Sequence, residues 1–130
     1  MNKLFELGIS ESDIKNMIEL VPEIYNMDEE DINNKIDILK YVECSDRHIR
    51  NIIVSNPMYL DRTDDGVLRL ISYLKKVGFS NINLLFDSNP YFLNYDVFEL
   101  EEYINKQVNL GKSIDVVVDE IEDNPYVIEE

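Results

Sequence analysis

A chain of 130 residues with 45% hydrophobic residues is long enough for one domain with a core of its own, which argues against a disordered tail. Its 27 acids against 12 Lys and Arg give a net charge of −15, the opposite of the basic balance that nucleic-acid binders usually carry. One cysteine excludes an internal disulfide, no apolar run approaches the roughly 20 residues of a membrane span, and the N-terminus is unlike a secretory signal, so we expect a cytoplasmic protein.

Four prolines divide the chain at nearly regular intervals. They stand at positions 22, 57, 90 and 125, separated by 35, 33 and 35 residues, and periods of this size are typical of helical arrays. Proline lacks an amide hydrogen and disfavours a helical residue before it, so each proline should mark the end of a helix. The second and third residues after each proline are all apolar or aromatic, namely Ile24, Tyr25, Tyr59, Leu60, Phe92, Leu93, Val127 and Ile128.

A short helix is predicted before each proline. Ser10, Ser45 and Ser113 lie twelve residues before their prolines and Ser80 lies ten before Pro90, and serine is a favoured N-cap. The apolar positions between cap and proline have helical spacing: Ile14, Ile18, Val21, Ile49, Ile52, Ile53, Ile82, Leu85, Phe86, Val117, Val118 and Ile121.

A longer helix is predicted after each of the first three prolines. Its apolar positions are Ile32, Ile36 and Leu39, then Val67, Leu70, Ile71 and Leu74, then Leu100, Tyr103 and Ile104. Gly8, Gly78 and Gly111 stand two residues before three of the serine caps, where a preceding helix would end in the left-handed conformation that glycine tolerates. Cys44 is expected to take roughly that place in the second unit.

These elements predict one all-α domain over residues 1–130. It would be a short α-solenoid of about three and a half proline-marked helix-turn-helix repeats, with units of roughly 8–43, 44–77, 78–110 and 111–130. A single helical pair cannot bury its apolar face alone, so neighbouring units should stack.

The stretch LKKVGFS at 74–80, followed by LFDSNPYFL at 85–93, resembles the mitochondrial transcription termination factor repeat. The resemblance extends over nearly the whole chain through the four proline sites. It implies a curved superhelix of helical hairpins with a concave groove, and a function in binding duplex DNA or RNA through basic residues. This chain is shorter and far more acidic than that pattern and shows no organelle-targeting segment, so the fold carries over better than the function.

The basic residues concentrate in the middle of the chain, where residues 35–76 hold eight Lys and Arg against six acids. Five of them are the candidates for contacts to a phosphate backbone: Arg47, Arg50, Arg69, Lys75 and Lys76. The alternative is that they only keep helix surfaces solvated. The aromatic residues near the prolines are expected in the core between repeats, with base stacking as the alternative.

Catalytic and metal sites find little support in the sequence. Cys44 and His48 are the only residues of their kinds, and we interpret them as a turn residue and a surface residue in place of a nucleophilic pair. The carboxylates at 99–102 and 119–123 are interpreted as solvated helix faces. Residues 61–66 share the start of a calcium-binding loop, but Thr63 and Ser72 replace expected ligands, so Thr63 or Asp64 should instead cap a helix beginning near Gly66. No cofactor or metal is expected.

The sequence therefore favours a non-enzymatic binding module whose partner is another protein. Nucleic-acid binding through the central basic residues is the second hypothesis, and an acidic mimic of nucleic acid that blocks a basic partner is the third. A homodimer is a further option, and no membrane association is expected.

Overall fold

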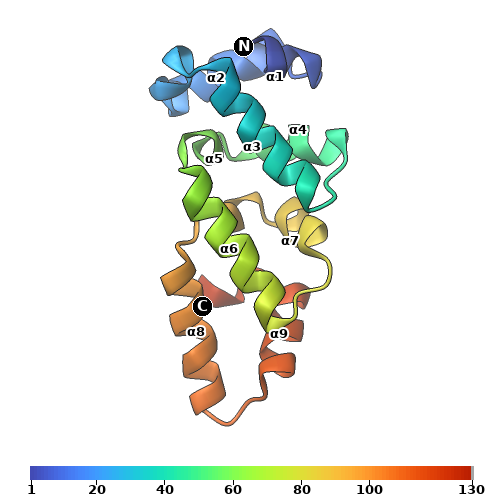
Figure 1. The fold of residues 1–130 in the computed structure, drawn as a ribbon, viewed down its shortest axis with the longest axis vertical. Coiled ribbons are helices and arrows are strands. Elements are labelled where there is room, and N and C mark those ends of the chain that lie inside the picture. Colours follow the sequence, from blue (N-terminus) through green and yellow to red (C-terminus); the bar gives the residue numbers. More distant parts are fainter. Residues whose placement is uncertain (130) are drawn as a thin grey trace. The chain divides into compact units, whose positions relative to one another are not determined.

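The computed structural model describes residues 1–129, in which every regular element is a helix (Figure 1). Nine α-helices and three 3-10 helices form, with no strand in that part of the chain, and this confirms the predicted all-α helical-repeat fold. The chain folds into two units, Met1–Asp64 and a second that begins at Asp65, and each is described by itself. The single domain expected over residues 1–130 and the curvature of the array stay predictions.

The first unit comprises six elements. They are α1 (Asn2–Glu6), α2 (Glu11–Leu20), η1 (Pro22–Asn26), α3 (Glu29–Tyr41), α4 (Asp46–Ser55) and α5 (Met58–Asp61). Helix α3 packs against α1, α4 and α5, while α2 packs against α4. The fully buried side chains of this unit include Leu4, Ile24, Ile32, Leu39, Ile49, Ile52, Ile53 and Tyr59. Most of the apolar positions expected in the core are therefore confirmed, although Ile18 is only half-buried and the adjacent Met17 is buried instead.

The second unit repeats this plan. It contains α6 (Asp64–Val77), whose first residue closes the first unit, and then α7 (Ile82–Ser88), η2 (Pro90–Asn94), α8 (Val97–Asn109), α9 (Ile114–Asp123) and η3 (Val127–Glu129). Helix α8 packs against α9, α7 against η2, and α9 against η3. Phe86 and Phe92 lie in the core with their ring centroids 6.4 Å apart. Tyr103, expected in the core, is half-buried.

The prolines end helices as predicted, and each is followed by a short helical turn. These turns, η1, α5, η2 and η3, were not anticipated from the sequence. They bury Ile24, Tyr59 and Phe92, but the expectation that all proline-proximal aromatic residues lie in the core was wrong. Tyr25, Tyr91 and Tyr126 are exposed. Tyr25 and Tyr91 lie on the outer faces of η1 and η2, because a single helical turn has one buried face, whereas Tyr126 comes just before η3.

Three of the four predicted serine caps are confirmed. The hydroxyl oxygens of Ser10, Ser45 and Ser113 accept hydrogen bonds from the backbone amides three residues later. Ser80 is not a cap, because α7 begins at Ile82 and Asn81 stands at its N-cap. The third unit is shorter by two residues before its proline, and its first helix is shortened with it.

The four helices α1, α3, α6 and α8 end in the same turn. In each, an amide beyond the helix donates to the carbonyl five residues earlier: Ile9 to Leu4, Cys44 to Leu39, Phe79 to Leu74 and Lys112 to Gln107. The residue before each donor has positive φ, at +87° in Gly8, +70° in Glu43, +106° in Gly78 and +105° in Gly111. This is the Schellman motif. Glu43, not Cys44, therefore replaces the glycine, while Cys44 is buried one position later, as Ile9 and Phe79 are.

Helix α1 lies before the first predicted unit, which began at residue 8, although Gly8 was expected to end a preceding helix. Its Schellman turn places it as the counterpart of the longer helices α3, α6 and α8. Helix α1 thus ends in the same turn as α3, α6 and α8, although it has only five residues.

Candidate binding surfaces

The five basic candidates lie on two helices, one in each unit. Arg47 and Arg50 belong to α4 in the first unit, whereas Arg69, Lys75 and Lys76 belong to α6 in the second. That the two groups form one phosphate-binding surface stays a prediction.

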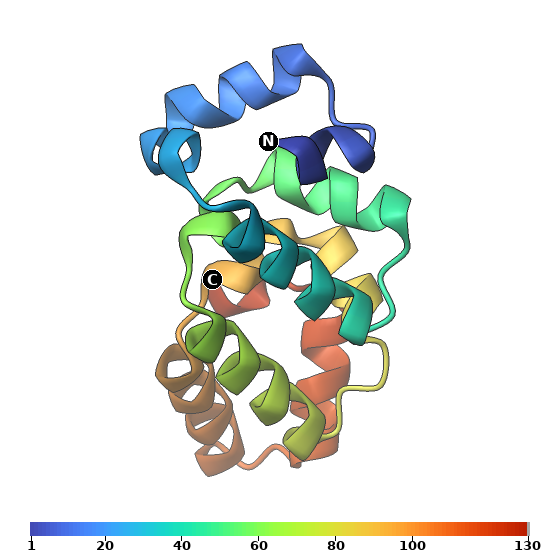
Figure 2. The ribbon, with the colours of Figure 1, turned by 45° about the horizontal axis from the view of Figure 1, so that its top comes forward.

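Arg50 has a structural role in the first unit. Its guanidinium Nη1 donates a hydrogen bond to the backbone carbonyl of Leu7 at 2.9 Å, where α4 comes close to α1 (Figure 2). Leu7 is the C-cap of α1, and carbonyls at a helix end have no partner within the helix. Arg50 is half-buried in this contact, while Arg47, three residues earlier, is exposed.

The basic residues of α6 lie on its exposed side. Arg69 and Lys76 are seven residues apart and so share one face of the helix, with Lys75 beside them. Lys75 and Lys76 occupy the last turn, where cations interact favourably with the negative end of the helix dipole. Helix stability alone is therefore a sufficient reason for these two lysines.

The burial of one lysine was not predicted from the sequence. Lys35 on α3 is only 4% exposed, and its Nζ lies 2.5 Å from Oδ1 of Asp64. Its backbone carbonyl accepts a hydrogen bond of 2.6 Å from the Tyr59 hydroxyl. Burial raises the pKa of Tyr59 far above its usual value, and the Cys44 and Asp64 side chains raise it further. Lys35 thus joins α3, α5 and the start of α6 at the end of the first unit.

The segment with partial likeness to a calcium loop spans the end of α5, the non-helical residues Arg62 and Thr63, and the start of α6. Helix α6 begins at Asp64, two residues earlier than expected, so Asp64, Asp65 and Gly66 all lie in its first turn. The Asp64 carboxylate is paired with Lys35.

Cys44 precedes α4, and His48 lies in its first turn. Ser45 lies between them as the N-cap of α4. Cys44 is buried, and His48, expected at the surface, is half-buried.

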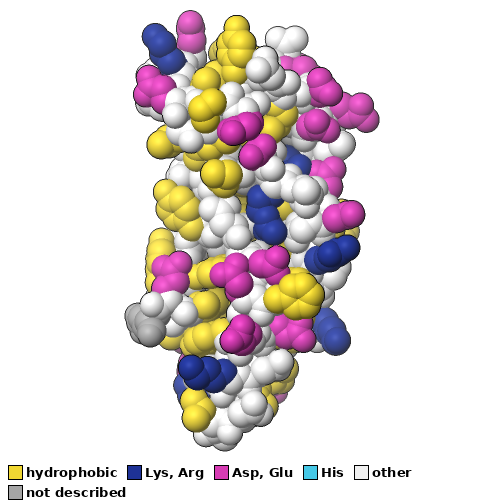
Figure 3. Space-filling view, turned by 90° about the vertical axis from the view of Figure 1, so that its left-hand side faces the viewer, with side chains coloured by type: hydrophobic (Ala, Val, Ile, Leu, Met, Phe, Trp, Pro, Cys, Tyr) yellow, Lys and Arg dark blue, Asp and Glu magenta, His cyan; other side chains and the backbone are white. Residues whose placement is uncertain are grey.

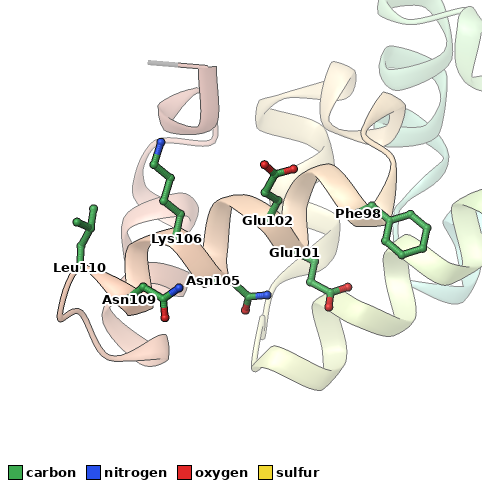
Figure 4. Close-up of a pocket in the computed structure, with 7 residues that line it drawn as sticks. All are labelled: Phe98, Glu101, Glu102, Asn105, Lys106, Asn109 and Leu110. Atoms are coloured by element: carbon green, nitrogen blue, oxygen red, sulfur yellow. The ribbon is translucent and has the colours of Figure 1, made fainter.

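A shallow hollow of about 760 Å³ runs along α8 in the second unit. Figure 4 shows its lining side chains projecting from this one helix, between Phe98 and Leu110. These two apolar side chains are each 71% exposed, and the acids Glu101 and Glu102 lie between them. Burial, followed by the charge of Glu101, raises the pKa of Tyr73 on α6. The hollow offers an apolar and acidic surface without a converging set of reactive groups.

A second depression, the α7–α9 groove, has a volume of about 400 Å³. It is lined by Asn81, Leu84, Leu85, Asp87 and Ser88 with Glu122 and Asp123. Burial raises the pKa of the Glu122 carboxyl, the Asp119 and Asp123 carboxylates raise it further, and a hydrogen bond from the Ser80 backbone opposes the rise. The sequence predicts a solvated helix face for these acids and gives no sign of the groove.

Acidic, basic and hydrophobic side chains are interspersed over the face drawn in Figure 3. The dark blue Lys and Arg side chains are scattered there among magenta acids and yellow hydrophobic groups. Of the helices in residues 1–129, none combines the length and apolar character required to cross a membrane.

Proline-marked helical pairs, with long helices closed by a common Schellman turn, define an all-α helical-repeat protein. The family model for mTERF matches residues 1–122, so the chain belongs to the mTERF family, and the resemblance predicted from the sequence is confirmed. No curated protein compared with the chain matches it.

Proposed function

We propose that this chain is a non-enzymatic binding module whose principal partner is another protein. The observation that carries the proposal is the division of its charge between the two units. Residues 1–64 hold 14 acids against seven Lys and Arg, and residues 65–130 hold 13 acids against five. The basic middle of the sequence straddles the boundary at Asp64, so each unit is acidic by itself. A duplex approaching either unit meets net repulsion.

Exposed apolar side chains among these acids support a protein partner. Leu84, Phe98 and Leu110 in the second unit are all well exposed, and the depressions that they line also contain carboxylates. Protein interfaces combine apolar contacts at their centre with a polar rim, which matches this mixture better than a phosphate backbone does. Arg50, moreover, is engaged by Leu7 and contributes less to a basic surface than its sequence position suggested.

Affinity capture with the tagged full chain from an extract of its native cells tests the proposal. The extract is divided, and one half is treated with nucleases before capture. We expect the same protein to be retained from both halves and to bind directly when purified. Retention that disappears after nuclease treatment, with direct binding to the released nucleic acid, would overturn the proposal.

Nucleic-acid binding is the second candidate. It is supported by the family and by the exposed side chains of Arg69, Lys75 and Lys76 on α6. Arg47 and Arg50 on α4 are the remaining candidates for phosphate contacts. Mimicry of nucleic acid by the acidic surface is a variant of the first proposal in which the partner is itself a nucleic-acid-binding protein.

A further inference from the structure

The α7–α9 groove combines an exposed leucine with carboxylates from two helices. Leu84 on α7 is 53% exposed, although the adjacent Leu85 is buried in the core. Asp87 borders Leu84 from the same helix, and Glu122 and Asp123 border it from the end of α9. The groove is therefore lined by apolar side chains and by acids from both helices.

The acids of α9 are placed where they destabilise the isolated helix. Asp119 and Asp123 are four residues apart, and like charges at this spacing repel. Asp123 is also the last residue of the helix, where the helix dipole is negative. The last turn of α9 lies within the described residues and contains no basic residue. Lys112 pairs with Glu120 at 2.9 Å.

Burial raises the pKa of the Glu122 carboxyl, and the Asp119 and Asp123 carboxylates raise it further, which is consistent with this crowding. A cation brought to the end of α9 would relieve the repulsion. A metal ion fits poorly, since no group of three or more His, Cys, Asp or Glu within residues 1–129 is arranged to hold one. A small cation would also leave Leu84 exposed to water.

Lysine and arginine side chains satisfy both features, because their apolar stems can cover a leucine while their charged ends reach carboxylates. An apolar side chain next to them in the same segment would bury the remaining surface of Leu84. We propose that the α7–α9 groove binds a segment of a partner protein that is rich in lysine or arginine and contains leucine. This inference rests on the proposed function and specifies the chemistry of the partner.

Fluorescence anisotropy with the full chain tests the proposal. The probe is a short fluorescein-labelled peptide in which lysines alternate with leucines, and a second peptide has glycine in place of leucine. The groove variant is Leu84→Ser with Asp123→Asn. The matched control is Leu20→Ser with Asp31→Asn, which also removes one exposed leucine and one exposed acid, but in the first unit.

We expect the leucine-containing peptide to bind more tightly than the glycine peptide, and the groove variant to weaken its binding by about tenfold, a typical effect of losing an apolar contact and a charge pair. The control should bind within about twofold of the parent chain, since rim charges far from a site contribute little. Asp123→Asn alone, which removes an unfavourable helix-end charge, keeps the test valid if Leu84→Ser disturbs α7.

Three results would overturn the inference: no binding of the leucine-containing peptide, equal binding of both peptides, or equal weakening by the groove and control variants. The last two would show that net charge alone attracts the probe. If the groove variant still captures the native partner as well as the parent chain does, the groove is not the site but the protein-binding function stands. If neither captures a protein after nuclease treatment, the proposed function itself fails.

Discussion

The guanidinium of Arg50 donates to the backbone carbonyl of Leu7 across 43 residues of sequence, and so ties α4 to the end of α1. Replacing Arg50 with Met keeps much of the stem but leaves this carbonyl without its donor. We expect the free energy of unfolding to fall by about 1.5–3 kcal/mol, the range for hydrogen bonds to charged groups. Arg47→Met, at an exposed position of the same helix, should change it by less than about 0.5 kcal/mol. Equal losses in urea denaturation would contradict this assignment.

Gly8 and Gly111 provide a matched pair for the Schellman turn. Both have positive φ, so alanine should destabilise at either position by roughly 1–2 kcal/mol. A Cβ on Gly8 would in addition lie 3.1 Å from Nη1 of Arg50, whereas a Cβ on Gly111 meets nothing within 4 Å. Gly8→Ala should therefore cost more than Gly111→Ala. The excess should vanish in an Arg50→Met background, and a double-mutant cycle measures it. An excess that persists there would mean that Arg50 is not its cause.

These turns indicate how far local sequence determines this fold. Gly8, Gly78 and Gly111 were placed correctly because only glycine adopts positive φ without strain. Glu43 was missed at the equivalent turn, since its residue type gives no such signal and the surrounding packing holds it there. Helix α1 was implied only by Gly8 at its end, because five helical residues are too few to show a periodic apolar pattern.

Tertiary pairing accounts for the remaining differences. Lys35 can lie on the buried side of α3 because its ammonium group pairs with the carboxylate of Asp64, 29 residues later. Nothing within α3 predicts that partner. The α7–α9 groove likewise depends on the packing of two helices that are separated by α8 in the chain. The basic residues could be identified from the sequence. The hydrogen bond from Arg50 to the Leu7 carbonyl could not be predicted from it.

Tyr59 should make the stability of the protein fall at alkaline pH. Burial raises its pKa, so above about pH 10 the unfolded chain loses the phenol proton while the folded chain keeps it. The folded state then binds more protons, and the free energy of unfolding decreases as pH rises. Tyr95, whose pKa is also raised by burial and by Glu129, contributes in the same direction.

Tyr59→Phe should make this alkaline loss shallower without abolishing it. At neutral pH the variant should be less stable by about 1–2 kcal/mol, because the buried hydrogen bond from the Tyr59 hydroxyl to the Lys35 carbonyl is lost. Urea denaturation at a series of pH values measures both effects. An unchanged alkaline slope would show that Tyr59 titrates normally in the folded chain.

The last prediction concerns nucleic acid, for which the family and the charge of the chain point in opposite directions. Binding to a phosphate backbone depends on releasing counterions, and the net charge of −15 opposes the approach of a duplex. At about 150 mM salt the Debye length is about 8 Å, which weakens the repulsion from distant acids without removing it. We expect no binding to random duplex DNA or RNA tighter than about 10⁻⁵ M.

Anisotropy titrations with duplex and single-stranded probes at two salt concentrations measure this affinity. The informative variant is Arg47→Ala with Arg69→Ala and Lys76→Ala, three exposed positions, while Arg50 stays intact because it supports α1. A lysine outside these helices, Lys15 on α2, provides an exposed single control. Micromolar binding that weakens steeply with salt, disappears in the triple variant and survives Lys15→Ala would show that the two acidic units still present a functional basic surface. The protein-partner proposal would then give way to nucleic-acid recognition through α4 and α6, because only direct phosphate contacts combine that salt dependence with loss at those three positions.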